Sequence, residues 1–176
     1  MTKKDMNRVA ETAIKMEQDS IDFYTEAIAR SSNGLGRSMF ESLVNDEKRH
    51  LKGLQKLLKN AGAPMPADKV LPPRKGTFKS AISTVFLKAR QELIERVPSD
   101  ADDVKALRIA LDLEKEGFRF YREAAANAAD PNVAGVYKTL QKEENEHIDF
   151  LQNTLSFLED SGNWFLWEEQ GLLDGG

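Results

Sequence analysis

The chain has 176 residues, of which 40% are hydrophobic, and this is enough apolar material for one core, so we expect a single domain over 1–176. Its 25 basic and 29 acidic residues give a net charge of −4, unlike the clustered positive surface that nucleic acids require. The absence of cysteine excludes disulfides, thiol nucleophiles and cysteine-ligated metals from this sequence. Because no signal-peptide pattern or long apolar run is visible, we expect a cytoplasmic protein that does not bind membranes.

The first third of the sequence predicts a helical hairpin over 5–61. Residues 5–30 have helical periodicity, and the SSNGLG stretch at 31–36 then interrupts it with asparagine and glycines. A second periodic segment covers 37–61 and ends at Gly62, with prolines at 64 and 66. The short connection predicts that the two helices run antiparallel.

A long crossover, residues 62–99, separates this hairpin from a second one over 100–160. The crossover is proline-rich and then predicts an extra amphipathic helix at 77–97, and Ser99 with Asp102 resembles a capping box. The third long helix is predicted over 100–128. The fourth begins at Asp130-Pro131, with an N-cap acceptor and a proline in the first helical position, and ends near residue 160.

The apolar-rich tail, 161–176, is predicted to fold back onto the body of the protein, with Trp164 and Trp167 as an apolar anchor or part of a dimer contact. The fold class is therefore all-α. We expect a four-helix bundle made of two antiparallel hairpins joined by one long crossover.

The two halves are copies of one another. Both histidines of the chain stand three residues after a glutamate, and a shift of 97 residues superposes the two halves without a gap. The shift places the following residues on one another: Glu17 on Glu114, Tyr24 on Tyr121, Glu47 on Glu144, and His50 on His147. A duplicated helical hairpin is the simplest account of this register.

The repeated polar residues share a helix face with apolar ones, so the polar face is also the core face. Closing the bundle would bury four carboxylates and two imidazoles, which is prohibitive without compensation. Protonation would relieve the charge, but two divalent cations cancel four carboxylates directly. Carboxylate oxygen with imidazole nitrogen suits iron or manganese, so the pattern predicts a dinuclear metal site and no organic cofactor. Asp46, Glu143 and Glu146 point about 100° or more away from the ligand glutamates and are predicted to face solvent.

This arrangement resembles the ferritin-like di-iron proteins, and within them the rubrerythrin type, which the WFLWEE stretch of the tail is also similar to. The resemblance implies that Glu47 and Glu144 bridge two iron or manganese ions. It also implies that Glu17 with His50 completes one ion and Glu114 with His147 the other. Tyr24 and Tyr121 would hydrogen-bond ligand carboxylates. The neighbouring Phe23 and Phe120 are predicted to pack in the core.

The sequence departs from rubrerythrins at two points. Those proteins carry an additional glutamate one turn after the third-helix ligand, where this chain has Gly117, mirrored by Ser20 in the first half. Gly117 leaves space for a small oxidant beside the metals, or serves close helix packing. The cysteine-rich rubredoxin module is also missing from this sequence, so we expect an external electron donor such as a rubredoxin-like carrier.

The resemblance implies an oxidoreductase that reduces hydrogen peroxide or dioxygen and acts in oxidative stress. Two alternatives remain open at this point: an iron-binding ferroxidase for storage or buffering, and a metal-binding bundle without turnover. A homodimer is expected, with or without exchange of hairpins across the long crossover. A cage of many subunits would favour storage.

Overall fold

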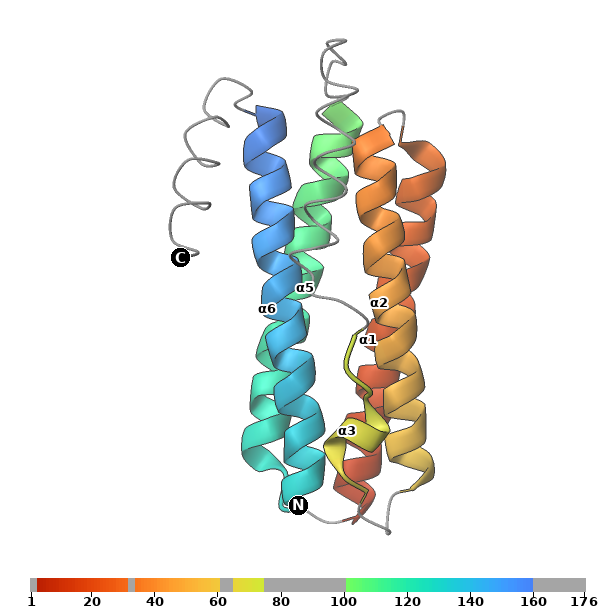
Figure 1. The fold of residues 1–176 in the computed structure, drawn as a ribbon, viewed down its shortest axis with the longest axis vertical. Coiled ribbons are helices and arrows are strands. Elements are labelled where there is room, and N and C mark those ends of the chain that lie inside the picture. Colours follow the sequence, from red (N-terminus) through yellow and green to blue (C-terminus); the bar gives the residue numbers. More distant parts are fainter. Residues whose placement is uncertain (1–2, 32–33, 61–64, 75–100, 160–176) are drawn as a thin grey trace.

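The computed structural model describes residues 3–31, 34–60, 65–74 and 101–159 (Figure 1). Within these ranges the chain forms the helices α1 (Lys3–Arg30), α2 (Gly34–Lys59), α3 (Ala67–Val70), α5 (Ala101–Asn127) and α6 (Pro131–Glu159), and no described residue forms a strand. The all-α fold class is confirmed, and the four long helices match the four predicted segments. The predicted helix at 77–97, the capping residue Ser99 and the tail at 161–176 lie outside the described residues.

The four long helices form a bundle of two hairpins (Figure 1). Contacts are concentrated within each hairpin, α1 with α2 and α5 with α6, and the hairpins meet through α1 with α5 and α2 with α6. The helices α2 and α5 run in one direction along the bundle, and α1 and α6 run in the other. This is the topology expected when two antiparallel hairpins are joined by one long connection.

The helix α2 starts at Gly34, three residues earlier than the sequence predicts. Gly36 was expected to belong to the connection, but it lies in the first turn of α2. A Cβ built on Gly36 would stand 3.1 Å from the hydroxyl of Ser31, the buried residue that follows α1. Glycine therefore permits the end of α1 and the start of α2 to approach closely. In a helix interior glycine is less favourable than alanine by about 1 kcal/mol, and this matters less in the first turn.

The start of α6 has the capping geometry that the sequence predicts. Asp130 Oδ1 accepts hydrogen bonds from the backbone N–H of Asn132 at 2.7 Å and of Val133 at 3.3 Å. Pro131 occupies the first helical position, where a missing N–H costs nothing. The turn between the hairpin's helices is thus fixed by local chemistry.

Apolar side chains gather in two clusters, one on each side of the bundle's centre. The first apolar cluster lies toward the 31–34 connection and consists of Tyr24, Ala27, Met39, Phe40, Leu43, Val44, Leu107, Ala110, Leu111, Phe150, Leu151 and Leu155. The second apolar cluster lies toward the opposite end and consists of Ala13, Leu54, Val70, Leu71, Tyr121, Ala124, Ala125, Val136, Tyr137 and Leu140. Phe23 packs against the first cluster and Phe120 against the second, as predicted.

The short helix α3 lies across α2 and α6 and joins the second apolar cluster (Figure 1). It fits there because both long helices have a glycine beneath it. A Cβ on Gly53 would stand 3.0 Å from Leu71 Cδ1, and a Cβ on Gly135 would stand 3.1 Å from Ala67 Cβ. Lys56 Nζ also donates to the backbone oxygen of Lys69 at 2.6 Å. In the described part of the chain, no helix has the length and apolarity needed to cross a membrane.

Candidate metal centre

The structure brings together all six side chains that the repeat singles out. Each is at most 3% exposed, although all six are ionisable. They form two overlapping groups of four whose ligand atoms lie within 4.8 Å of one another: Glu17, Glu47, His50 and Glu144 in one, and Glu47, Glu114, Glu144 and His147 in the other. The groups lie between the two apolar clusters, one ligand-bearing face coming from each long helix. We call the first group half-site one and the second group half-site two.

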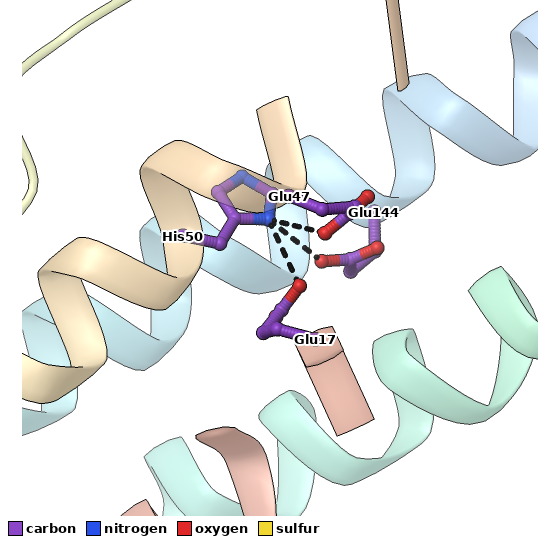
Figure 2. A group of neighbouring side chains, drawn as sticks. All are labelled: Glu17, Glu47, His50 and Glu144. Carbon is purple, nitrogen blue, oxygen red and sulfur yellow. Dashed lines mark hydrogen bonds and ion pairs between the residues drawn. The ribbon is translucent and has the colours of Figure 1, made fainter. Parts of the chain in front are cut away.

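Glu47 and Glu144 belong to both half-sites and give one oxygen to each; Figure 2 shows how they face His50 in half-site one. His50 Nδ1 lies 3.0 Å from Glu47 Oε2 and 3.4 Å from Glu144 Oε1. His147 Nδ1 lies 3.2 Å from the other oxygen of Glu47, Oε1, and 3.6 Å from the other oxygen of Glu144, Oε2. Two carboxylates that each face both histidines have the geometry of bridging ligands.

The two remaining glutamates each serve one half-site only. Glu17 Oε2 lies 3.6 Å from His50 Nδ1, as Figure 2 shows, and Glu114 Oε2 lies 3.2 Å from His147 Nδ1. The rings of His50 and His147 are stacked with their centroids 5.7 Å apart. The arrangement therefore repeats the two-fold relation between the hairpins at the level of single atoms.

Burial and mutual repulsion divide the four carboxyl groups into two kinds. Burial raises the pKa of Glu17 well above its usual value, and the neighbouring Glu47 carboxylate raises it further. Burial likewise raises the pKa of Glu114, reinforced by Glu144. Burial is the largest single influence on Glu47 and Glu144 and acts to raise both pKa values, and at Glu144 the Glu47 carboxylate adds to it. The charge and hydrogen bonds of the neighbouring histidines and outer glutamates together outweigh these effects, so both pKa values fall. The outer pair thus prefers the protonated form and the shared pair the ionised form.

The two imidazoles respond to the carboxylates around them. Burial by itself lowers the pKa of His50, but Glu47 and the other carboxylates raise it well above its usual value. At His147 burial likewise acts to lower the pKa, but the surrounding carboxylates, Glu114 foremost, raise it well above its usual value. Two neutral carboxyl groups, two carboxylates and two imidazolium groups sum to zero charge. Four protons distributed in this way would neutralise the six side chains in the absence of metal.

The tyrosines Tyr24 and Tyr121 hold the outer glutamates from the opposite hairpin. Tyr24 Oη donates to Glu114 Oε1, and Tyr121 Oη donates to Glu17 Oε1. Burial raises the pKa of both phenols well above the usual value, and the facing glutamate raises it further. Both phenols therefore keep their protons and act as hydrogen-bond donors to the carboxyl groups of the cluster.

Asp46 and Glu143 correct the sequence analysis, which predicted that they face solvent. They are only 7% and 9% exposed. His50 Nε2 lies 2.6 Å from Glu143 Oε2, and His147 Nε2 lies 3.4 Å from Asp46 Oδ2. In a bundle each helix touches two neighbours, so a residue turned 100° from the core direction faces an adjacent helix rather than water. Glu146, which was assigned to the surface with them, keeps 37% of its side chain exposed.

The negative charges of Asp46 and Glu143 are each neutralised by an arginine. The Arg49 guanidinium contacts Glu143 Oε2, and the Arg74 guanidinium lies 2.5 Å from Asp46 Oδ2. Burial acts to raise the pKa of Glu143, but the hydrogen bond from His50 and the charge of Arg49 lower it to about 2. Each histidine therefore has its Nδ1 atom toward the carboxylate cluster and its Nε2 atom toward a carboxylate–arginine pair.

Gly117 faces the cluster, as the sequence suggested. A Cβ built on it would stand 3.5 Å from Glu144 Cδ and 3.6 Å from Glu144 Oε2, which is ordinary van der Waals contact. A methyl group fits at this position, whereas a longer side chain would have to enter the cluster. The glycine thus places no side chain between this point of α5 and the Glu144 carboxylate.

The donor set fits a pair of divalent cations. Glu47 Oε1 and Glu144 Oε1 are buried, and in the described part of the chain neither accepts a well-aligned hydrogen bond, although a histidine Nδ1 lies 3.2 Å from the first and 3.4 Å from the second. Buried acceptors without partners are costly, and a cation would satisfy them. Oxygen and imidazole nitrogen are ligands for iron, manganese and zinc, and four carboxylates offset two divalent charges. That the six side chains bind metal stays a prediction.

Comparison with known proteins supports this assignment at the level of the family. The profile of the Rubrerythrin family matches residues 1–58, and the profile of the Ferritin-like domain matches residues 102–163. All six residues of the two half-sites lie inside these matches. No match was found among curated proteins.

One solved structure with a similar fold is a two-domain protein from Anabaena variabilis that contains DJ-1/ThiJ/PfpI-like and ferritin-like domains. It superposes with a TM-score of 0.66 over 91% of this chain, at 18% sequence identity. The present chain spans 38% of that protein's length. At this identity the likeness shows the fold alone.

The bundle, its topology and the two matches define a ferritin-like protein. Such bundles place a glutamate on two helices and a Glu-x-x-His motif on the other two, and Glu17, Glu114 and the paired motifs of α2 and α6 follow that pattern. Within this class, the match of residues 1–58 to the Rubrerythrin family supports a protein of the rubrerythrin type.

Proposed function

We propose that this protein is a di-iron carboxylate oxidoreductase that reduces hydrogen peroxide to water. The observation that carries the proposal is the shared pair, Glu47 and Glu144, which offers one oxygen atom to each half-site. A site built this way holds two metal ions close together and keeps the charge of the cluster near zero. Manganese is compatible with the same donors, and metal analysis decides between the two.

When bound by the six side chains, ferrous ions would supply the two electrons that, together with two protons, reduce one hydrogen peroxide to two waters. The chain contributes the surroundings of that reaction. The two apolar clusters keep water away on both sides, and Tyr24 and Tyr121 hold the outer glutamates by hydrogen bonds. Gly117 places no side chain against Glu144, and we propose that a small oxidant approaches the carboxylates from this side.

The electron donor is proposed to be a separate carrier protein. The sequence has no cysteine and therefore no iron–sulfur or rubredoxin-type centre of its own. We also propose a homodimer as the working form. Native mass measurement tests this, and a cage of many subunits would instead favour iron storage.

The test begins with protein purified without chelators or added metal, whose metal content is measured by elemental analysis. The ferrous form is then prepared anaerobically and mixed with hydrogen peroxide, and its reoxidation is followed by absorbance. We expect two iron ions per chain and reoxidation faster than that of free ferrous iron at equal concentration. Equal rates would contradict the oxidoreductase and leave a metal-binding bundle without turnover.

The matched control is the double variant Glu47→Gln, Glu144→Gln, which keeps the shape of both shared side chains and removes their charge. We expect it to fold and to retain less than one iron ion per chain, because both half-sites lose their common ligands. A sustained assay with a chemical reductant separates the alternatives further. An enzyme consumes peroxide through many cycles, whereas a ferroxidase takes up iron in proportion to the oxidant and stops.

A further inference from the structure

One charged side chain beside the metal centre, that of Arg74, does not belong to the repeated hairpins. His50 pairs with Glu143 and His147 pairs with Asp46, each across to the other hairpin. Each of these two carboxylates in turn pairs with an arginine. At half-site one, the arginine is Arg49, which belongs to α2 and stands two residues after Glu47. The repeat predicts that its counterpart stands 97 residues later, on α6.

That counterpart is Glu146, an acid. The second hairpin therefore has no arginine at the position equivalent to Arg49. The guanidinium at half-site two belongs to Arg74, which follows α3 in the crossover and lies outside both copies of the repeat. Arg74 Nη1 also lies 3.9 Å from Glu146 Oε2, so the residue at the counterpart position faces the arginine that replaces it.

The segment that carries Arg74 is held firmly against the bundle. Val70 and Leu71 are buried in the second apolar cluster. Arg49 Nη1 donates to the backbone oxygen of Pro72 at 3.1 Å, so the arginine of half-site one also fixes the chain two residues before Arg74. The Arg74 side chain is 16% exposed, which leaves its guanidinium little freedom away from Asp46.

We propose that Arg74 is a positioning residue for half-site two. It holds Asp46, which faces His147 Nε2, and so orients the His147 ring with its Nδ1 atom toward Glu47 and Glu114. The inference rests on the proposed metal centre, and it assigns to the crossover a part of the site that the duplicated hairpins do not contain. Outer partners of this kind typically change metal affinity by about 10- to 100-fold.

The test measures binding of Co²⁺, a spectroscopic probe for divalent sites, to protein freed of metal. We expect wild type to bind two ions, and Arg74→Ala to bind one as wild type does and the other about 10- to 100-fold more weakly. The matched control is Arg122→Ala, which removes an exposed arginine of α5. Two ions bound by Arg74→Ala with wild-type affinity would overturn the inference and leave the metal centre intact. Failure of wild type to bind two ions would overturn the proposed function itself.

Double variants identify which half-site is affected. Glu17→Gln removes a ligand from half-site one, and Glu114→Gln removes a ligand from half-site two. We expect Arg74→Ala to weaken the remaining ion in the Glu17→Gln background and to have no effect in the Glu114→Gln background. An equal effect in both backgrounds would contradict a role confined to half-site two.

Rescue of Co²⁺ binding by a second substitution distinguishes a positioning role of Arg74 from a general structural role. In the variant Arg74→Ala, Glu146→Arg, the arginine returns to the position that Arg49 occupies in the first hairpin. The side chain at 146 already reaches the Arg74 guanidinium, so a guanidinium placed there should reach Asp46. We expect it to restore most of the lost Co²⁺ affinity and the absorption spectrum of the two-ion form. If Arg74→Ala unfolds, as judged by circular dichroism, a folded double variant with restored binding supports the inference, and one without it contradicts the inference.

Discussion

At the scale of single residues, each histidine presents its two ring nitrogens to different surroundings. Nδ1 of His50 faces Glu17, Glu47 and Glu144, and Nε2 faces Glu143. A metal bound at Nδ1 would leave the proton on Nε2, and this N–H would donate a hydrogen bond to Glu143. With no metal bound, the raised pKa of the ring favours a proton on both nitrogens. The same side chains therefore neutralise the cluster in two ways, with protons or with cations.

Protons and cations compete for the same side chains. Between pH 6 and 8 we therefore expect the stability of the metal-free protein to fall with rising pH and the stabilisation by bound metal to grow. In the metal-free protein the pKa values of His50 and His147 lie well above the usual 6.5, so the stability they contribute is complete below about pH 6.5 and declines as pH rises. Glu17 and Glu114, whose pKa values are also raised, act in the same direction. Metal binding requires the deprotonated ligands, so its stabilisation grows with pH.

We therefore expect the difference in Tm between metal-loaded and chelated protein to widen as pH rises from 6 to 8. Differential scanning calorimetry of both forms, in buffers of matched ionic strength, measures this difference. A gap that stays constant or narrows would show that the six side chains do not exchange protons for metal.

At the scale of the helices, local signals decide where each element begins and ends. The sequence placed the start of α6 at Asp130-Pro131, and the structure has the helix at Pro131–Glu159 with Asp130 as its N-cap. The predicted end of the first helix at residue 30 is also correct, because α1 ends at Arg30. The start of α2 was predicted too late, because Gly34 and Gly36 were interpreted as part of the connection although they can serve in a first helical turn.

Asp130→Ala is expected to lower the free energy of unfolding by about 1 kcal/mol, because two backbone N–H groups lose their acceptor. Urea unfolding of the metal-free protein measures the change, and the slope m should stay constant. Asp130→Asn is the control, since asparagine caps as well as aspartate, and its stability should stay close to that of wild type. A loss in the asparagine variant as large as in the alanine variant would assign the effect to charge instead.

At the scale of the whole molecule, the crossover segment is part of the bundle's construction. α3 and the residues after it pack on α2 and α6 and contribute Val70 and Leu71 to the second apolar cluster. Gly53 makes this possible, since its missing side chain admits the crossover against α2. Phe150 occupies the matching position of the second hairpin and packs in the first apolar cluster. The two-fold relation between the hairpins is thus broken where the crossover docks.

Gly53→Leu is expected to destabilise the protein by about 1–3 kcal/mol, even though leucine favours a helix more than glycine does. A Cβ at this position already stands 3.0 Å from Leu71 Cδ1 and 3.4 Å from the backbone oxygen of Val70, so a full leucine must displace the crossover. Thermal and urea unfolding measure the loss. Lys52→Leu, at an exposed position of the same helix, is the control, and an equal change in both variants would contradict the docking of the crossover on Gly53.

The helical hairpins, their duplication and the six side chains at the centre could be predicted from the order of the residues alone. These follow from spacing along one chain, because apolar and ligand residues repeat with the period of the helix and with the register of 97. The charge argument also needed only the sequence, since buried carboxylates require compensation whatever the details of packing.

The surroundings of those six side chains could not be predicted in this way, because they depend on how the helices pack. Asp46 and Glu143 contact a histidine instead of water because of how α2 is rotated about its axis and shifted along the bundle relative to α6. The spacing of residues within one helix predicts neither the rotation nor the shift. The pairing of Arg74 with Asp46 depends further on where an irregular segment crosses the bundle. Such contacts join residues far apart in the chain, and their geometry is set by the packing of whole helices rather than by local propensity.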